Sequence, residues 1–466
     1  MCHYAENCRK RGRALSRIGT PICDFVQAYG KKDAARLHMP GHKGTAFLGC
    51  EALDITEIAG ADELYQPDGI IAESEKNARQ LFGAGKTVYG TEGSSQCIRA
   101  MLFLALQSAK AKKTEGRPAV LAGRNAHKAF HYACALLDLE VEWLLPEQES
   151  LLCTCPITPE QVEKRLAGLA EKPIAVYITA PDYLGYRPDI RRLAEVCRAA
   201  GVPLLVDNAH GAYLKFLTPS EHPVDLGAAM TCDSAHKTLP VLTGGAYLQL
   251  STEWAEQMGG EAKKAMELFG STSPSYLILQ SLDCFNRYAA EGYPRKLAET
   301  VKMLEHLREA LRQRGWEVME SDPLRLTLLA AKMGYTGREI AERLRNGGVE
   351  CEFADGEAVV LMATPENRPE DFRRVLDALD GIEPCPALLP LHVPAVLPER
   401  KMTIRQAVFA GREEIPCDAA VGRVCAMPCV SCPPAVPIVA GGEVITEEML
   451  PLFRAYGVER VDVVKF

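Results

Sequence analysis

The sequence predicts an α/β protein built on a mostly parallel sheet with helices on both faces. In residues 62–250, short apolar segments alternate with longer amphipathic ones. This β-α-β-α order is typical of parallel sheets, because each strand needs a crossover connection before the next parallel strand can begin. The length of 466 residues also exceeds what one core of about 250–300 residues supports. We therefore expect a large α/β domain followed by smaller units.

Each element of the large domain follows from its local pattern. Thr158 predicts a helix N-cap, because Glu160 and Gln161 occupy the first turn after it. Apolar runs of four to six residues bounded by polar or glycine residues predict the strands. In chain order the expected strands are 87–89, 119–122, 140–145, 174–179 and 204–207, and the expected helices are 96–109, a helix from 126 onward, 158–170 and 190–200.

A second, smaller unit is expected after a long amphipathic helix at 294–314. Strand, helix, strand and strand at 324–331, 336–346, 349–353 and 358–362 precede a closing helix at 370–379. A proline-rich linker at 383–398 leads to a last short helix and a terminal strand. The predicted domains are an N-terminal segment (1–35), a large domain (36–290), a small α+β domain (291–382) and a C-terminal module (383–466).

Composition excludes several classes of protein. A net charge of -8 argues against nucleic acid or an anionic membrane surface as the main partner. The apolar runs fall short of the about 20 residues that span a bilayer. Residues 1–10 are polar and lack the apolar core of a secretory signal, so we expect a cytoplasmic protein.

The 17 cysteines are scattered, which favours small apolar thiols over a disulfide framework. Cys417, Cys425, Cys429 and Cys432 form the one cluster. Four thiolates can hold zinc, but the first two spacings lack the usual paired pattern. We expect no metal.

Two segments that follow predicted strands carry the strongest functional signal. Asp207 ends an apolar strand and is followed by His210, and Lys237 lies in Ser-Ala-His-Lys at 234–237. A lysine amine can form a Schiff base with an aldehyde, while a carboxylate keeps a pyridine nitrogen protonated so that the ring accepts electrons. The pair predicts pyridoxal phosphate (PLP) as cofactor. The alternative is a surface lysine and a helix-capping aspartate.

Further polar residues stand at neighbouring strand ends. Gly93, Ser94 and Ser95 precede a helix, where backbone N–H groups and hydroxyls can bind a phosphate, although an ordinary helix cap also explains them. Ser234 and His236 could add donors to the same phosphate. An imidazole at His127 could stack on the cofactor ring, or it is a solvated loop histidine. His210 could donate to Asp207 or to the cofactor.

The chain resembles the PLP-dependent decarboxylases of ornithine, lysine and arginine, in their short form without an N-terminal receiver-like domain. The specific elements are His-Met-Pro-Gly-His-Lys-Gly at 38–44 and Ser-Ala-His-Lys at 234–237. The resemblance covers roughly residues 35–285 and is weaker at Gly422-Arg423, 432–434 and Gly442-Glu443. Its other segments are 54–57, 62–64, 93–95, 124–128, 207–211, 271–276 and 281–283.

This resemblance implies an aminotransferase-like, fold-type I large domain and a set of roles. Lys237 would form the Schiff base, Asp207 would pair with the pyridine nitrogen, and His127 would stack on the ring. His210 would lie beside the ring near the imine. Ser273 and Ser275 would reach the active site of a neighbouring subunit, which implies a homodimer or a higher homo-oligomer with shared active sites. The phosphate would be held by Gly93, Ser94, Ser95, Ser234 and His236.

The implied reaction is decarboxylation of arginine, lysine or ornithine to the amine, a step of polyamine biosynthesis. Lys237 or His236 would return the proton to Cα. The alternatives are an aminotransferase or another PLP enzyme acting on a different amino acid, and a non-catalytic relative. No arginine is placed to retain a substrate α-carboxylate, which favours its loss.

Several positions near the expected substrate depart from the family pattern, and a cationic substrate also requires acidic residues to bind it (an acidic wall). The departures are Asp182, Asn208, Gly244 and the segment 432–435, and they affect substrate identity more than PLP binding. The acid candidates are Glu57, Asp62, Glu63 and Glu443, and the alternative for each is a solvated or capping acid.

Overall fold

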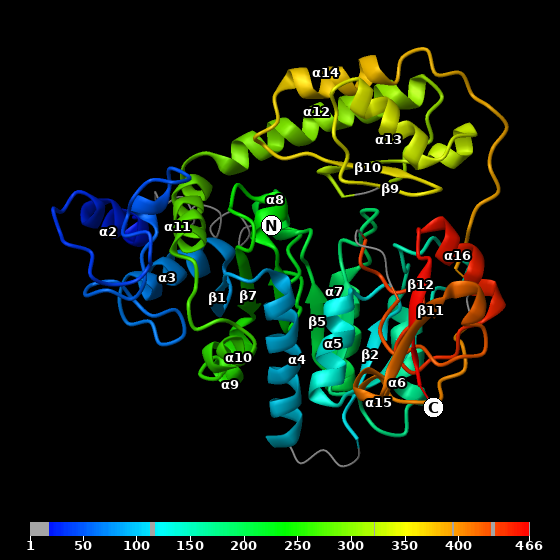
Figure 1. Ribbon diagram of the computed structural model, residues 1–466, viewed down its shortest axis with the longest axis horizontal. Coiled ribbons are helices and arrows are strands. Elements are labelled where there is room, and N and C mark those ends of the chain that lie inside the picture. The colour runs from blue at the N-terminus through cyan, green and yellow to red at the C-terminus, as the bar shows by residue number, and fades with distance from the viewer. Residues whose placement is uncertain (1–17, 112–116, 321, 394–395, 430–433, 466) are drawn as a thin grey trace, which may run out of the picture.

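A computed structural model describes residues 18–111, 117–320, 322–393, 396–429 and 434–465 (Figure 1). Its centre is a seven-stranded sheet of order β1-β7-β6-β5-β4-β2-β3, in which only β7 runs antiparallel to its neighbours. The predicted mostly parallel α/β sheet is confirmed. The strands are β1 (Lys86–Gly90), β2 (Ala119–Gly123), β3 (Glu140–Leu144), β4 (Ala175–Thr179), β5 (Leu204–Asp207), β6 (Met230–Asp233) and β7 (Ala246–Leu250).

Helices cover both faces of this sheet. Along β5, Leu205 packs into one buried cluster while Leu204 and Val206 pack into another, as alternation along a strand requires. The helices of this part are α2 (Pro21–Gly30), α3 (Ile70–Phe82), α4 (Ser94–Ala111), α5 (Lys128–Leu137), α6 (Pro159–Gly168), α7 (Ile190–Ala200), α8 (Ala235–Thr238), α9 (Thr252–Met258), α10 (Ala262–Leu268) and α11 (Tyr276–Glu291), with short 3-10 turns at Glu51–Leu53 and Ala212–Phe216.

Two helix starts differ from the prediction. Helix α4 begins at Ser94, so Ser94 and Ser95 lie in its first turn. Helix α5 begins at Lys128 because the His127 side chain caps it, accepting a hydrogen bond from the Ala129 N–H at 3.1 Å. The capping box of α6, between Thr158 and Gln161, is as predicted.

A second sheet lies beyond the α8 end of the large one, with α12–α14 packed on it (Figure 1). It is antiparallel, of order β8-β10-β9. The predicted strand at 349–353 is wrong for most of its length, because the Val349 N–H closes the end of α13 on the Leu344 carbonyl. The elements are α12 (Tyr293–Gln313), β8 (Arg325–Leu328), a 3-10 turn (Ala330–Met333), α13 (Gly337–Asn346), β9 (Phe353–Ala354), β10 (Val359–Met362) and α14 (Pro369–Ala378).

The last part of the chain forms a two-stranded sheet with its own buried cluster. Cys417, Cys425 and Cys429 lie buried in that cluster, and the described residues contain no group of three or more side chains that could hold a metal ion. Cys432 lies outside the described residues. The predicted domain boundaries stay predictions. The elements are α15 (Ile404–Phe409), β11 (Arg412–Pro416), 3-10 turns at Cys417–Ala419 and Glu447–Met449, α16 (Leu450–Ala455) and β12 (Arg460–Val464).

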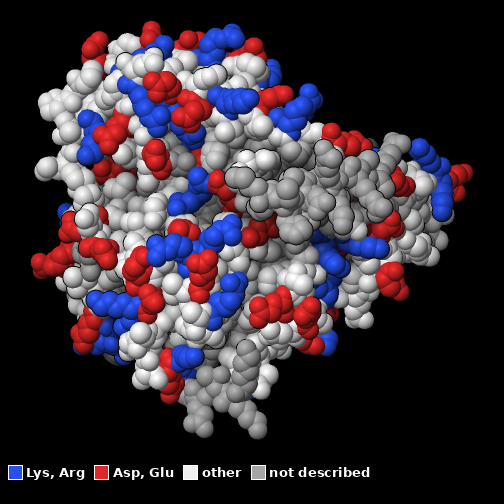
Figure 2. All heavy atoms as spheres, turned by 180° about the vertical axis from the view of Figure 1, so that it is seen from behind, with Lys and Arg blue, Asp and Glu red and all other residues white. Residues whose placement is uncertain are grey.

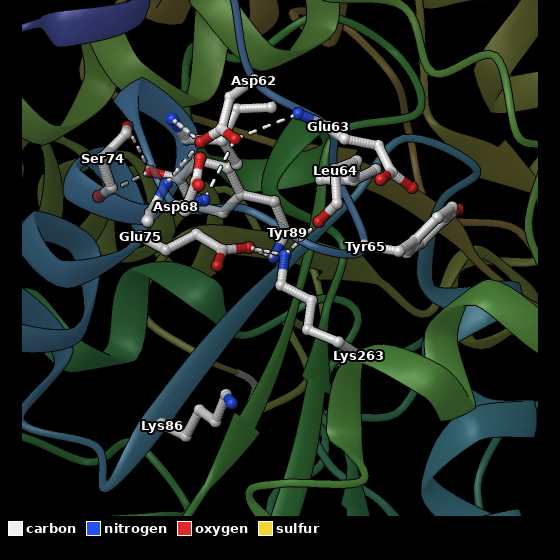
Figure 3. A network of polar contacts seen from close by, with 12 residues as sticks. Asp62, Glu63, Leu64, Tyr65, Asp68, Ser74, Glu75, Lys86, Tyr89 and Lys263 are labelled. Atoms are coloured by element: carbon white, nitrogen blue, oxygen red, sulfur yellow. Dashed lines mark hydrogen bonds and ion pairs between the residues drawn. The ribbon is translucent and has the colours of Figure 1, made fainter.

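A polar network fastens the segment before α3 to the large sheet (Figure 3). Lys263 of α10 donates to Glu75 and to the Leu64 carbonyl, both at 2.6 Å. Glu75 also accepts from the Tyr89 N–H of β1 at 2.7 Å. Burial raises the pKa of the Glu75 carboxyl, and the Lys263 ammonium opposes that rise. This buried pair therefore holds α3, α10 and β1 together.

Acidic and basic side chains are mixed on one face of the molecule, as the modest net charge of the sequence leads one to expect. On the face shown in Figure 2, acidic and basic side chains of the described residues are interspersed rather than gathered into a patch of one sign. Within the described ranges, no helix is both long and apolar enough to cross a membrane.

Candidate active site

A small cavity lies where the parallel strands of the large sheet end. This is the edge at which open α/β sheets bind ligands. A wider groove between α7 and α9 contains none of the predicted site residues. The cavity brings together Ser94, His127, Asp207, His210 and Lys237 from the predicted set. Its lining residues are Ser94, Asn125, His127, Cys153, Thr179, Tyr183, Asp207, Ala209, His210, Lys237, Pro434 and Val436.

Lys237 and His210 contact each other directly. The Lys237 Nζ lies 2.9 Å from the His210 Nε2. Burial lowers the pKa of Lys237, although the Asp207 carboxylate opposes this, so its amine loses a proton more readily than a solvated lysine. Burial and the Lys237 charge lower the pKa of His210, which keeps the imidazole neutral. A neutral His210 accepts at Nε2 and carries its hydrogen on Nδ1.

Asp207 is held at the end of β5 by three donors. The Tyr177 hydroxyl donates to Oδ2 at 3.0 Å, and the Ala209 N–H donates to Oδ1 at 3.2 Å. The Cys232 thiol donates to Oδ1 at 3.4 Å. At 2% exposure, the carboxylate is buried and fixed in orientation, as a partner for a cationic ring nitrogen must be.

His127 is a neutral ring in a defined tautomer. Burial lowers its pKa to about 4. Because its Nδ1 accepts from the Ala129 N–H, the hydrogen of the neutral ring stands on Nε2. The cap of α5 thus fixes the ring in place on the wall of the cavity.

The residues predicted to bind phosphate lie around the start of α4. Gly93 has a φ of +69° and donates its N–H to the Gly244 carbonyl at 2.8 Å. The His236 Nδ1 donates to the Gly245 carbonyl at 3.0 Å, and its ring lies beside Gly93. Ser94 lines the cavity, and Ser95 follows it in the first turn of α4. Ser234 is buried just before α8.

Two buried polar atoms of the cavity wall have no hydrogen-bond partner among the described residues. They are the Thr179 Oγ1 and the His210 Nδ1. Buried polar groups in native proteins nearly always have a partner, so these atoms indicate a polar guest. Together with Asp207, Lys237 and the helix start at Ser94, they fit the ring, aldehyde and phosphate of PLP.

Ser273 and Ser275 lie apart from the cavity in this single chain. Ser273 is exposed, and its N–H donates to the Ser271 Oγ at 3.1 Å. Ser275 precedes α11 without making a side-chain cap. Their predicted role at a neighbouring subunit stays a prediction.

Two of the four candidates for the acidic wall, Glu443 and Asp62, make other contacts in the structure. Glu443 pairs through both oxygens with Arg124, at 2.8 and 2.7 Å. Asp62 accepts five backbone N–H groups, from Glu63, Asp68, Gly69, Ile71 and Ala72. Asp62 therefore has the capping role given as its alternative, and the Glu443 carboxylate is already paired with a cation. Glu57 and Glu63 are exposed and lie outside the cavity lining.

The positions that depart from the family pattern are structural. Buried Asp182 accepts three backbone N–H groups of the turn after β4, from Leu184, Gly185 and Tyr186. Buried Asn208 donates to Asp233 at 2.5 Å. Gly244 has a φ of +100°, and a Cβ there would lie 2.6 Å from the Thr91 carbonyl oxygen. The segment 432–435 is described only from 434 onward.

Sequence reasoning missed Tyr183, which lines the cavity, and two charged residues behind it, Glu352 and Arg325, which lie outside the lining. The Tyr183 hydroxyl donates to Glu352 at 2.8 Å, and the Tyr183 ring meets the His210 ring edge-on at 5.1 Å. The charge of Glu352 raises the pKa of Lys237, while that of Arg325 lowers it. Glu352 and Arg325 lie within predicted strands, where a charged side chain is unusual. Their charge was the feature of the sequence that could have pointed to them as functional residues.

Arg325 acts as a clamp between the two sheets. It is 1% exposed, and its Nη1 donates to the carbonyls of Asp182 and Tyr183. Its Nε lies 3.3 Å from Asp322. The guanidinium therefore holds β8 against the turn that carries Tyr183.

Comparisons with known proteins agree with this geometry. An arginine decarboxylase of Bacillus subtilis (strain 168) is 29% identical over 93% of both chains. An arginine decarboxylase of Halalkalibacterium halodurans is 28% identical, again over 93% of both. The constitutive lysine decarboxylase of Escherichia coli (strain K12) is 24% identical over 58% of this chain and 40% of its own.

Solved structures show the same fold. A lysine decarboxylase of Francisella novicida superposes with a TM-score of 0.79 at 16% identity, over 96% of this chain and 81% of its own. The E. coli constitutive lysine decarboxylase superposes with a TM-score of 0.74 at 18% identity, over 100% and 85%. These matches confirm the fold-type I architecture. The family model for the major domain of Orn/Lys/Arg decarboxylases matches residues 20–328, and the chain therefore belongs to this family of PLP-dependent amino-acid decarboxylases.

Proposed function

We propose that the protein decarboxylates a basic amino acid, with arginine as the first candidate, and that Lys237 holds its PLP. The observation that carries the proposal is the contact between the Lys237 amine and a neutral His210 in a cavity that also contains Asp207. Arginine is favoured because the relatives named arginine decarboxylase match over nearly their whole length.

When bound, PLP supplies an electron-accepting ring that weakens the bond from Cα to the carboxylate. Lys237 would hold its aldehyde, and Asp207 would accept the pyridine N–H. The neutral ring of His127 would lie on one face of the cofactor, with Nε2–H available as a donor. The phosphate would be bound by Gly93, Ser94, Ser95, Ser234 and His236.

Lys237 is the better candidate for returning the proton to Cα. Its amine lines the cavity, whereas the His236 Nδ1 is committed to the Gly245 carbonyl and His236 is absent from the lining. The lowered pKa of Lys237 makes its amine a better base-acid pair than a solvated lysine for giving and taking a proton. His210, as a neutral acceptor 2.9 Å away, would orient the amine.

Glu352 would recognise the cationic end of the substrate. It is exposed, it is close enough for its charge to raise the pKa of Lys237, and the Tyr183 hydroxyl donates to it at 2.8 Å. A hydrogen bond to a charged group contributes about 1.5–3 kcal/mol. Glu352→Gln should therefore raise KM for the basic substrate about 10- to 100-fold while PLP occupancy is unchanged.

Glu350→Gln is the matched control for this variant. Glu350 is two residues away, but it is exposed and paired with Arg345 at 3.0 Å. The control should keep the KM of the unaltered protein. Equal KM values in both variants would show that Glu352 does not bind the substrate.

The alternative reaction is aminotransfer, which keeps the substrate α-carboxylate and needs a cation to bind it. Arg325 is the cation nearest to that description. In this structure its Nη1 donates to two backbone carbonyls, which supports the clamp role instead. Purified protein should be supplied with PLP, a basic amino acid and a keto acid, and both CO₂ and the new amino acid measured. Transfer to the keto acid without CO₂ would replace the proposal.

The decisive experiment compares arginine, lysine and ornithine. We expect an absorbance band from the Lys237-bound cofactor, its loss in Lys237→Ala, and CO₂ release mainly from arginine. CO₂ from lysine or ornithine alone would keep the reaction and change the substrate. The homodimer with a shared site, the cytoplasmic location and the role in polyamine biosynthesis remain predictions.

A further inference from the structure

Two cysteines that are far apart in the sequence lie side by side. Cys23 is in the first turn of α2 and Cys284 is in α11, 261 positions later. Their Sγ atoms are 2.9 Å apart. A disulfide bond is about 2.05 Å long, so a closing movement of less than about 1 Å would bring the sulfurs to bonding distance.

The main chain around these thiols is fixed by other contacts. Asp283, next to Cys284, accepts the Cys23 N–H at 3.0 Å and the Ser74 hydroxyl at 2.6 Å. The Cys23 Sγ also lies 3.2 Å from the Gln280 carbonyl oxygen of α11. The start of α2 is therefore anchored to α11 through backbone groups. The proximity of the thiols follows from this packing and not from a chance side-chain rotation.

The two thiols differ in the way that a reacting pair requires. Cys284 is exposed, whereas Cys23 is only 4% exposed. The hydrogen bond between the two thiols lowers the pKa of Cys284, and the Arg287 guanidinium acts in the same direction, while burial and the Asp283 carboxylate oppose them. That hydrogen bond and burial raise the pKa of Cys23. Cys284 is thus the accessible thiol and the one that loses its proton more readily, and Cys23 lies buried behind it.

We propose that Cys23 and Cys284 are an oxidation site at which a peroxide converts the thiol pair into a reversible disulfide between α2 and α11. The Cys284 thiolate attacks one oxygen of the peroxide and breaks the O–O bond, which gives a sulfenic acid and releases hydroxide. The Cys23 sulfur then attacks the sulfenic sulfur, and its proton leaves with the hydroxyl as water. Two thiols lose two electrons in total, and hydrogen peroxide becomes two water molecules.

Other described cysteines lack this combination. Cys417, Cys425 and Cys429 are buried, and burial raises the pKa of each. Cys385 is exposed, but its sulfur contacts the Tyr335 hydroxyl instead of a second thiol. Among the described residues, Cys23 and Cys284 are therefore the pair expected to oxidise first.

The disulfide would stiffen a helix that supports the candidate active site. The Ser281 Oγ of α11 accepts the Leu242 N–H at 3.1 Å, in the loop between α8 and β7. Lys237 lies on α8. A crosslink that closes a long loop restricts the unfolded chain, so oxidation should raise the midpoint temperature of unfolding.

Peptide mapping of the full-length protein tests the proposal. The reduced protein is treated with stoichiometric hydrogen peroxide, free thiols are alkylated, and the chain is cut with trypsin without reductant. Cys23 and Cys284 are the only cysteines of the tryptic peptides 18–31 and 265–287, so a crosslink between those peptides identifies the bond. We expect it to be the most abundant crosslink at low peroxide and to disappear with dithiothreitol.

Variants separate this site from general oxidation. Cys284→Ser should abolish the crosslink and leave alkylatable Cys23, while Cys385→Ser should leave the crosslink unchanged. Peroxide should raise the unfolding temperature of the unaltered protein and of Cys385→Ser, but not that of Cys284→Ser. Crosslinks of Cys284 spread over several partners, or sulfinic acid at Cys284 with Cys23 still free, would overturn the proposal.

Discussion

Replacing Glu443 by glutamine tests whether this carboxylate holds the C-terminal part of the chain in place. Its side chain is 3% exposed, that of Arg124 is 12% exposed, and the two share a bidentate contact at 2.8 and 2.7 Å. The Ala440 N–H also donates to Glu443 at 2.7 Å. Removing one member of a buried ion pair costs about 3–5 kcal/mol. Glutamine keeps the shape and one acceptor, so we expect a loss near 3 kcal/mol, the lower end of that range.

Urea denaturation followed by tryptophan fluorescence measures this loss. The Arg124 guanidinium lies 4.9 Å from the centre of the Trp143 ring, so the indole reports on the same region. Glu413→Gln is the control, because Glu413 forms a partly exposed pair with Arg423 at 2.7 Å in the same part of the chain, with side chains 42% and 32% exposed. Ion pairs near the surface contribute about 0–1 kcal/mol to the free energy of unfolding, so the control should lose much less stability than Glu443→Gln. Equal midpoint shifts in the two variants would refute the reasoning, and a raised KM with unchanged stability would restore Glu443 as part of the acidic wall.

Two further variants test the buried network and the His127 ring. Lys263→Met should lower the free energy of unfolding by about 3 kcal/mol at pH 8 and by less at pH 5. Burial raises the pKa of Glu75, and the variant removes the ammonium that opposes this rise. Stability linked to a raised pKa is lost as pH rises, so the variant is weakest at the higher pH. Unfolding midpoints at both pH values check this, and a pH-independent loss would contradict it. His127→Asn should keep the cap of α5 and the unfolding temperature while weakening PLP binding, whereas His127→Ala should also lose about 1 kcal/mol of stability. PLP titrations and melting curves separate the two effects, and tight PLP binding by His127→Asn would exclude ring contact.

The cofactor side of the site could be predicted because Asp207, His127 and Lys237 each lie at the end of a strand or within four residues after it. Apolar runs fix where the strands end, and parallel strands bring those ends to one edge of the sheet. Asp207, His127 and Lys237 therefore meet in one cavity without any knowledge of loop conformation. The same reasoning cannot tell a residue that caps a helix from one that contacts the cofactor. His127 is both a cap and a wall residue, and that dual use moved the start of α5 from the expected position to Lys128.

Acidic residues were harder to assign, because a carboxylate's role depends on the donors that the fold brings to it. Asp62 looked available, yet the segment before α3 and the first turn of α3 direct five N–H groups at it. Glu443 looked available, yet it meets Arg124, 319 positions earlier in the chain. Neither contact follows from a local pattern, since both depend on tertiary packing.

The second sheet is tied to the wall of the cavity through Tyr183. Arg325 of β8 holds the carbonyls of Asp182 and Tyr183, so the turn that carries Tyr183 is fixed to that sheet. The Tyr183 hydroxyl in turn fixes Glu352, which stands just before β9. A shift of the second sheet would therefore move the clamp, the aromatic ring against His210 and the carboxylate together. Under the role proposed for Glu352, substrate preference would depend on how the two sheets are joined. Motifs of the large domain alone do not report on that contact, so they left the choice among basic amino acids open.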